Sequence, residues 1–176
     1  HVEFTDRRSL PMMALRGLTV FPGMMLTFEV ERSMSIAALN MAMSDDQIIY
    51  LVPQIDIATD IPTPEDVYGV GTVCRIKQMM KQPGSKTVRV MAEGIERGRT
   101  LAVRTDMPCF VAEVEPMPDV AERKTARIEA LIRHCCNLFD AYVTVSGNMA
   151  PESVITVLRS TNAGFVSNFI AQHVFL

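Results

Sequence analysis

The residue types that most often perform chemistry are few and scattered in this chain of 176 residues. Its histidines lie at positions 1, 134 and 173, and its cysteines at positions 74, 109, 135 and 136. No cysteine pair has the C-x-x-C spacing of a zinc or redox site, and two neighbouring residues, His134 and Cys135, cannot chelate an ion without further ligands. The phosphate-binding G-x-x-x-x-G-K-[ST], the nucleophile motif G-x-S-x-G and the zinc motif H-E-x-x-H are all missing from the sequence. We therefore expect no catalytic residue, no metal site, and reduced, mostly buried cysteines.

Methionine is the unusual feature of the composition. The chain has 13 methionines, including neighbouring pairs at 12–13, 24–25 and 79–80. Flexible thioether side chains suit surfaces that must accept many partners, so one interpretation is an adaptable binding patch. The alternative is that the methionines simply fill the core.

Charge is distributed unevenly along the chain. Residues 1–68 carry 4 basic and 10 acidic side chains, residues 69–105 carry 8 and 2, and residues 106–176 carry 5 and 8. The basic middle third could form a nucleic-acid-binding face with Arg75, Lys77, Lys81, Lys86 and Arg89. The favoured alternative is the solvated side of a sheet, because Arg89 alternates with Val88 and Val90, and because no aromatic residue lies among these charges to stack on bases.

Two short apolar runs predict the first strands, Leu10–Leu15 and Met24–Val30. Between them, Phe21-Pro22-Gly23 predicts a tight turn, because Pro22 fixes its own φ and Gly23 tolerates a positive φ. Phe21 would then either cap a core or face a partner. Ser33 is a candidate N-cap for a short helix whose apolar face contains Ile36, Leu39 and Met43 and which ends at Asp45-Asp46.

Strand signals dominate the next part of the chain. The continuous apolar run 48–52 predicts a central strand, and the proline-rich acidic stretch 53–68 predicts an extended loop. Residues 69–79 and 87–92 predict a hairpin with its turn at 82–85, followed by a bend between Gly94 and Gly98. Further strands at 100–104 and 109–115 bring the expected total to six or seven.

After Pro116-Met-Pro118 the pattern becomes helical. Asp119 and Glu122 resemble a capping box, and a long helix is expected to bury Ile128, Leu131, Ile132, Cys135, Leu138, Phe139 and Tyr142 and to end at Gly147-Asn148. Pro151 suits the first turn of a second helix, and Thr161 or Asn162 the start of a third. Because the chain stops at the apolar residues Phe175-Leu176 at the end of a helix, we expect a fragment whose helical part originally continued.

Length and composition place the chain among globular proteins of one large or two small domains. A hydrophobic fraction of 48% with 21% charged residues is ordinary for a soluble chain. No apolar run approaches the roughly 18 residues that span a bilayer, and no signal-peptide core is present. The expectation is a cytoplasmic protein without membrane contact.

Several blocks, taken in order, resemble the N-terminal domain of the ATP-dependent Lon protease family over about residues 9–176. They are Leu10-Pro-Met-Met-Ala-Leu-Arg-Gly, Val20-Phe-Pro-Gly-Met-Met, Ser35-Ile-Ala-Ala-Leu, Pro62-Thr-Pro-Glu-Asp-Val-Tyr-Gly-Val-Gly-Thr-Val and Val90-Met-Ala-Glu-Gly-Ile-Glu-Arg-Gly-Arg. The resemblance implies an α+β fold: a β-rich, PUA-like pseudo-barrel with one short helix over residues 9–116, followed by a helical subdomain over residues 119–176.

The resemblance also implies a function. In the family this module captures unfolded, damaged or short-lived regulatory proteins and helps to assemble a homohexamer, while an AAA+ motor that uses ATP and Mg and a Ser-Lys dyad carry out the proteolysis. No residue here matches the motor or the dyad, so the fragment is expected to be non-catalytic and to hold no cofactor. The hypothesis is that clients bind an apolar surface made by Met12, Met13, Phe21, Pro22, Met24 and Met25. The rival hypothesis is DNA or RNA binding by the basic hairpin 75–89, and a bacterial cytosol is favoured over an organelle.

Overall fold

The computed structural model describes residues 6–81, 83–119, 124–147, 149 and 151–174. Its internal contacts divide the chain into two compact units, His1–Pro118 and Asp119–Leu176.

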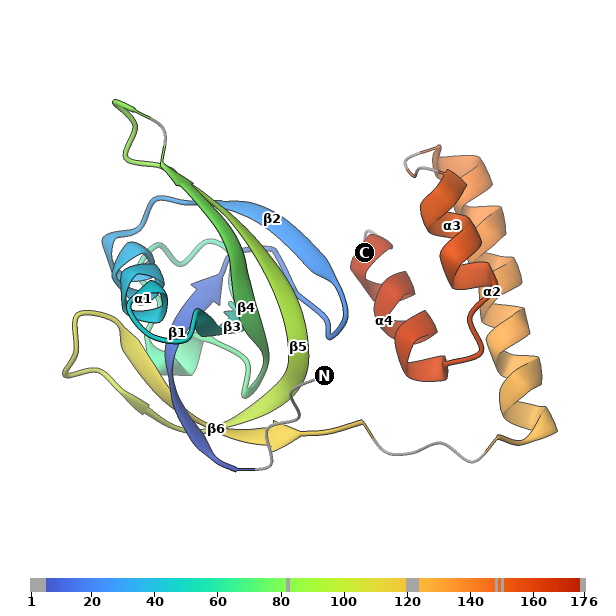
Figure 1. Cartoon of the computed structure of the whole chain (residues 1–176), viewed down its shortest axis with the longest axis horizontal. Helices are drawn as coiled ribbons and strands as arrows, with labels where there is room; N and C mark the ends of the chain where they lie inside the picture. The colour runs from blue at the N-terminus through green and yellow to red at the C-terminus, as the bar shows by residue number, and fades with distance from the viewer. Residues whose placement is uncertain (1–5, 82, 120–123, 148, 150, 175–176) are drawn as a thin grey trace. The chain divides into compact units, whose positions relative to one another are not determined.

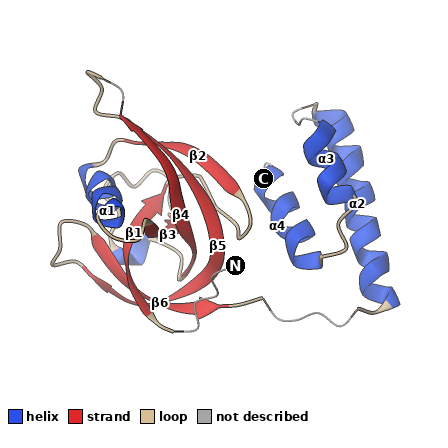
Figure 2. Ribbon diagram, in the orientation of Figure 1, coloured by secondary structure: helices blue, strands red, loops and turns tan. Residues whose placement is uncertain are grey.

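The first unit is built mainly from strands, with one α-helix and one short 3-10 helix in its described part (Figures 1 and 2). Its elements are β1 (Arg8–Leu15), β2 (Met25–Val30), α1 (Ser33–Met43), β3 (Ile48–Pro53), η1 (Pro64–Asp66), β4 (Val70–Lys81), β5 (Val88–Arg104) and β6 (Phe110–Met117). These bounds confirm the expected strands, except that residues 88–104 form one long strand rather than two.

The six strands form one sheet in the order β2-β5-β4-β3-β1-β6, and an additional pairing of β5 with β6 closes a ring of five strands. β1 and β3 are parallel, and the other pairs are antiparallel. β5 can pair along both ends because it bends in the middle: Val73 faces Glu96 and Cys74 faces Gly94, so Ile95 is an extra residue in the ladder. The predicted bend between Gly94 and Gly98 and the α+β pseudo-barrel are therefore confirmed.

The turn before β2 has the geometry that the sequence predicts. The Met24 amide donates to the Phe21 carbonyl oxygen at 3.1 Å, and Gly23 has a φ of 76°. Pro22 followed by a glycine with positive φ is the pattern of a type II turn. The turn is bound to β5, because the Gly23 amide donates to the Gly94 carbonyl oxygen at 2.9 Å and the Gly94 amide donates to the Met24 carbonyl oxygen at 2.8 Å.

Two apolar clusters lie on the two faces of the inner strands. Met13 on β1 belongs to the cluster that α1 covers with Ala38 and Leu39. Its neighbour Met12 belongs to the other cluster, together with Tyr50 of β3. All of residues 48–52 are buried, which confirms that β3 is a central strand with no solvent-facing side.

The N-cap of the short helix α1 lies one residue earlier than expected. Ser33 is the first helical residue, Arg32 occupies the N-cap position, and no side chain there accepts a hydrogen bond from the helix. The predicted apolar face was also partly wrong, because α1 buries Ser35, Ala38, Leu39 and Ala42 while Met43 is exposed. The reason is that small residues let this helix approach β1 closely, and apolar spacing alone does not reveal this.

The second unit contains three helices in its described part: α2 (Ala126–Ser146), α3 (Pro151–Leu158) and α4 (Ala163–His173). Asn162 caps α4, since its Oδ1 accepts from the Phe165 amide at 2.8 Å, and Gly147 ends α2 with a φ of 66°. The Glu122 half of the expected capping box lies outside the described residues. The cap that α2 shows is Thr125, whose hydroxyl accepts from the Ile128 amide at 3.2 Å.

Only part of the apolar face predicted for α2 is buried. Its buried residues are Ile132, Cys136 and Phe139. Leu131, Cys135 and Leu138 are exposed, so the expectation that they are buried was wrong. Phe139 packs edge-on against Phe169 of α4, with ring centroids 5.9 Å apart.

Candidate functional site

The six residues of the hypothesised client surface do not share one environment. Met12, Met13 and Met24 are buried, with 1%, 3% and 5% of their surface exposed, so their placement on the surface is corrected. For Met12 and Met13 the physical reason is that they lie on β1, both faces of which are covered. Met24 lies in the turn that is hydrogen-bonded to Gly94 of β5. Phe21 and Pro22 are half-buried, and Met25 is 51% exposed.

Met25 belongs to a face that the sequence did not reveal. In the sheet, Met25 is opposite Glu93, Thr27 is opposite Met91, and Met91 is in turn opposite Gln78 of β4. One step further along the same face, Met80 lies opposite Arg89. Directly opposite residues point to the same side of a sheet, so Met25, Met91 and Met80 follow a diagonal across β2, β5 and β4. We call these three residues the methionine face.

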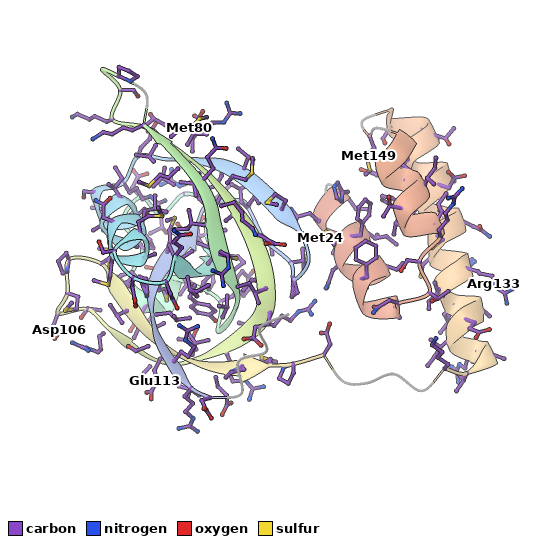
Figure 3. All side chains as sticks on the ribbon, viewed as in Figure 1. Met24, Met80, Asp106, Glu113, Arg133 and Met149 are labelled. Carbon is purple, nitrogen blue, oxygen red and sulfur yellow. The ribbon has the colours of Figure 1, made fainter. Side chains whose placement is uncertain are left out.

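The methionine face is open to solvent. Met80 is 48% exposed, and Met91 is half-buried beside it; Figure 3 marks Met80 on β4, close to the hairpin loop. A hollow of about 190 Å³ lies between these two methionines and is also lined by Thr27, Gln78 and Arg89. The sequence analysis missed Met80 and Met91, although the alternation of residues 87–92 and the 79–80 methionine pair were signals that could have located them.

The basic hairpin shares this face with acidic residues. Lys77 forms an ion pair with Glu93, Nζ to Oε2, at 2.6 Å. Arg75 also lies opposite Glu93, and Arg89 is opposite Glu29 across the β2–β5 ladder. The exposed cations of the hairpin are Lys77, Lys81, Lys86 and Arg89, while Arg75 is half-buried. The charges are therefore interleaved rather than gathered into a continuous positive surface.

The cysteines do not form a reactive centre in the described part of the chain. Burial raises the pKa of Cys74 and of Cys109, and burial together with the neighbouring Cys135 raises the pKa of Cys136. Only Cys135 is exposed among the four. The described residues contain no group of three or more His, Cys, Asp or Glu side chains that could hold a metal ion. None of the described helices is long and apolar enough to cross a membrane.

Comparison with known proteins places this fold in a family. The model of the ATP-dependent protease La (LON) substrate-binding domain matches residues 9–176. The chain belongs to this Lon family. It is 39% identical over 172 residues to the Lon protease of Desulforamulus reducens and 36% identical over 171 residues to that of Clostridioides difficile. These alignments cover 98% and 95% of this chain but only 21% and 22% of the two relatives, so the chain spans about a fifth of their length.

Solved structures support the same fold. The N-terminal domain of a Mycobacterium avium complex Lon protease superposes with a TM-score of 0.77 at 19% identity, covering 96% of this chain and 84% of that one. A Lon N-terminal domain protein from Xanthomonas campestris superposes with a TM-score of 0.56 at 14% identity, covering 88% of this chain and 92% of that one. At these identities the likeness concerns the fold alone.

Proposed function

We propose that this Lon-family domain captures unfolded or damaged proteins on the methionine face and performs no catalysis itself. The observation that carries the proposal is the diagonal of Met25, Met91 and Met80 across the neighbouring strands β2, β5 and β4, in which Met25 and Met80 are about half exposed. The family's description as a substrate-binding domain supports the same assignment. Phe21 and Pro22 stay in the proposal as a half-buried border next to Met25.

The chemistry of the face suits clients that have no fixed sequence. Methionine side chains adapt their shape to different apolar partners, while the strands below them stay fixed. The domain therefore loses little conformational entropy on binding. An apolar strip three side chains long supports only weak binding. Affinity would rise by avidity if several copies of the domain engaged one unfolded chain.

Nucleic-acid binding is the second candidate, because Lys81, Lys86 and Arg89 are exposed on the same hairpin. Two observations weigh against it. Lys77 is neutralised by Glu93 at 2.6 Å, and no aromatic side chain lies on the hairpin to stack on bases. Phosphate binding through these cations would weaken steeply with salt, whereas apolar capture would change little.

Fluorescence anisotropy separates the two candidates. A labelled, permanently unfolded polypeptide and a labelled oligonucleotide are each titrated with the domain at low and at high salt. The proposal predicts polypeptide binding that persists at high salt and falls roughly tenfold in the Met25→Ser/Met80→Ser double variant. Met107→Ser is the matched control, because Met107 is also an exposed methionine but lies outside the methionine face. Unchanged binding by a folded double variant would exclude the methionine face, and salt-sensitive oligonucleotide binding alone would favour the hairpin.

The role of the whole protein is part of the same proposal. We infer that the domain delivers clients to an ATP-dependent serine protease and takes part in assembling its homohexamer in a bacterial cytoplasm. ATP and Mg would bind outside this chain, because the sequence contains no phosphate-binding loop. No residue of this domain is assigned to the cleavage reaction.

A further inference from the structure

A cleft on the first unit lies beside the start of α1 and has no role in the proposal above. Two hollows of about 460 and 260 Å³ share Met13, Ala14, Arg32, Ser35 and Asp60 in their lining, so they adjoin. We call this combined space the Arg32 cleft. None of the three residues of the methionine face lines it.

The first turn of α1 offers unsatisfied donors to this cleft. The earliest backbone hydrogen bond of the helix is donated by Ile36 to the Arg32 carbonyl oxygen at 2.9 Å, so the three preceding amides have no partner within the helix. No side chain caps them, and the first turn contains no acidic residue. A helix start of this kind attracts anions through its N–H groups and its dipole.

Ser35 gives a second and independent indication of a ligand. Only 9% of its surface is exposed, yet it lines both hollows. In the described part of the chain its hydroxyl group forms no hydrogen bond. Its oxygen is not one of the sealed, unpartnered polar atoms of the described residues, so a group that enters the cleft can reach it and exchange a hydrogen bond with it.

Arg32 supplies a positive charge at the same place. Both of its terminal nitrogens donate to Gln54 Oε1 at 3.2 Å, and Gln54 is fixed in turn by donating to the carbonyl oxygens of Asp56 and Thr59 at 2.6 Å. The partner of this guanidinium is thus a neutral amide, and no carboxylate of the described residues forms an ion pair with it. Burial and the nearby Arg16 lower the pKa of Arg32, with Asp60 acting in the opposite direction. An anion would relieve this unbalanced charge.

The surroundings of Arg32 restrict which anion fits. Arg16 is already paired with Asp60 at 2.7 Å, and Glu29 and Glu31 line the larger hollow, so a doubly charged phosphate would meet three carboxylates. The smaller hollow has no acid other than Asp60. Its walls are largely apolar and come from Met12, Met34, Ile61, Pro62 and Phe110. A single negative charge next to an apolar group matches these walls best.

We propose that the Arg32 cleft binds the C-terminal carboxylate of a peptide that ends in an apolar residue. The carboxylate accepts hydrogen bonds from Arg32, from the Ser35 hydroxyl and from the amides of the first turn of α1. The last side chain of the peptide occupies the smaller hollow, where Met12 and Met13 lie buried in the wall. Capture of a terminal carboxylate by backbone N–H groups and a cation is a known mode of peptide recognition.

The test compares two short fluorescein-labelled peptides that end in leucine and differ only in a free carboxylate or an amide at the C-terminus. We expect the acid to bind roughly tenfold or more tightly than the amide, because a charge-assisted hydrogen bond is lost in the amide. Arg32→Gln abolishes this difference and Ser35→Ala reduces it, whereas the exposed control Arg89→Gln preserves it. Equal affinity of the wild-type domain for both peptides overturns the proposal.

Two further measurements keep the test decisive. If Arg32→Gln fails to fold, NMR of the wild-type domain replaces it. The backbone amide signals of Ser33, Met34 and Ser35 should shift with the acid peptide and not with the amidated peptide. Shifts confined to other residues would overturn the assignment. Inorganic phosphate and acetate then compete with the acid peptide. Displacement by phosphate at much lower concentration than by acetate would overturn the preference for a carboxylate. We expect the double variant Met25→Ser/Met80→Ser to keep the wild-type ratio of affinities for the acid and the amidated peptide. Failure of the proposal for the Arg32 cleft is therefore distinguishable from failure of the proposal for the methionine face.

Discussion

Replacing Gly94 with alanine tests how tightly the Phe21 turn is held on β5. Gly94 exchanges two hydrogen bonds with the turn, from the Gly23 amide at 2.9 Å and to the Met24 carbonyl oxygen at 2.8 Å. A Cβ atom on Gly94 would overlap the Phe21 carbonyl oxygen and lie 3.0 Å from the Phe21 carbonyl carbon. Both obstacles are backbone atoms, so no side-chain rotation can make room. The turn must move away from β5 and weaken both hydrogen bonds.

The expected cost follows from these contacts. Overpacking costs about 1–3 kcal/mol, and each of the two weakened hydrogen bonds costs about 1 kcal/mol, so Gly94→Ala should lower the free energy of unfolding by roughly 3–5 kcal/mol. Gly69→Ala is the matched control, because nothing lies within 4 Å of its added Cβ, and it should change stability by no more than about 0.5 kcal/mol.

Urea denaturation measures the free energy of unfolding. Hydrogen exchange in peptides from β2 and β5 then reports the stability of the first unit separately from the helices of the second unit. Since the displaced turn leads directly into Met25, Gly94→Ala should also weaken binding of an unfolded polypeptide. Equal stability of Gly94→Ala and Gly69→Ala would refute the close apposition of the turn and β5.

Three other predictions follow from single contacts. Tyr50→Phe removes the buried hydroxyl that donates to the Gly98 carbonyl oxygen at 2.8 Å and should cost about 1–2 kcal/mol, seen as a lower Tm; an unchanged Tm would contradict it. Burial is the largest single influence on the pKa of Asp46 and raises it, but the hydrogen bonds from Arg8 and from the Ile48 amide, together with the positive charge of Arg8, outweigh burial and lower the net pKa. Asp46→Asn should therefore destabilise the domain at pH 7, with the effect fading as the pH falls below about 4; a constant difference would contradict it. Alkylation with iodoacetamide should label Cys135 alone in the folded chain and all four cysteines in urea, and mass spectrometry showing two or more labels without urea would contradict the burial of the others.

The strands were predictable because their signals are local. Alternation in 87–92 and the continuous apolar run 48–52 each identify a strand within a few residues, and Pro22-Gly23 identifies the turn. The closing of the ring was not predictable in this way. It depends on β5 continuing through Gly94 and Gly98 to pair with β6, and two glycines with a local irregularity suggest an interruption rather than one long strand.

The helical faces show a second limit of local patterns. On α2 the spacing correctly identified a long amphipathic helix, but it combined two faces, because Ile132 and Leu131 are both apolar while only the first is buried. Neighbouring helices decide which face is covered, and sequence spacing does not identify those neighbours. The same reason explains α1, where Ala38 and Ala42 are buried while Ile36 is only partly buried and Met43 is exposed.

Met12 and Met13 show where a pattern was available but was interpreted differently. The run Leu10–Leu15 is as continuously apolar as 48–52, and such runs indicate strands covered on both faces. Applied to β1, this rule places Met12 on one buried face and Met13 on the other, as the two clusters do. The client-surface hypothesis placed both methionines on the surface, because methionine is common at adaptable interfaces, whereas the alternative of core filling is what the structure shows for these two residues. By contrast, Met25 on β2 and Met80 on β4 remain about half exposed, on the side of the sheet that α1 does not cover.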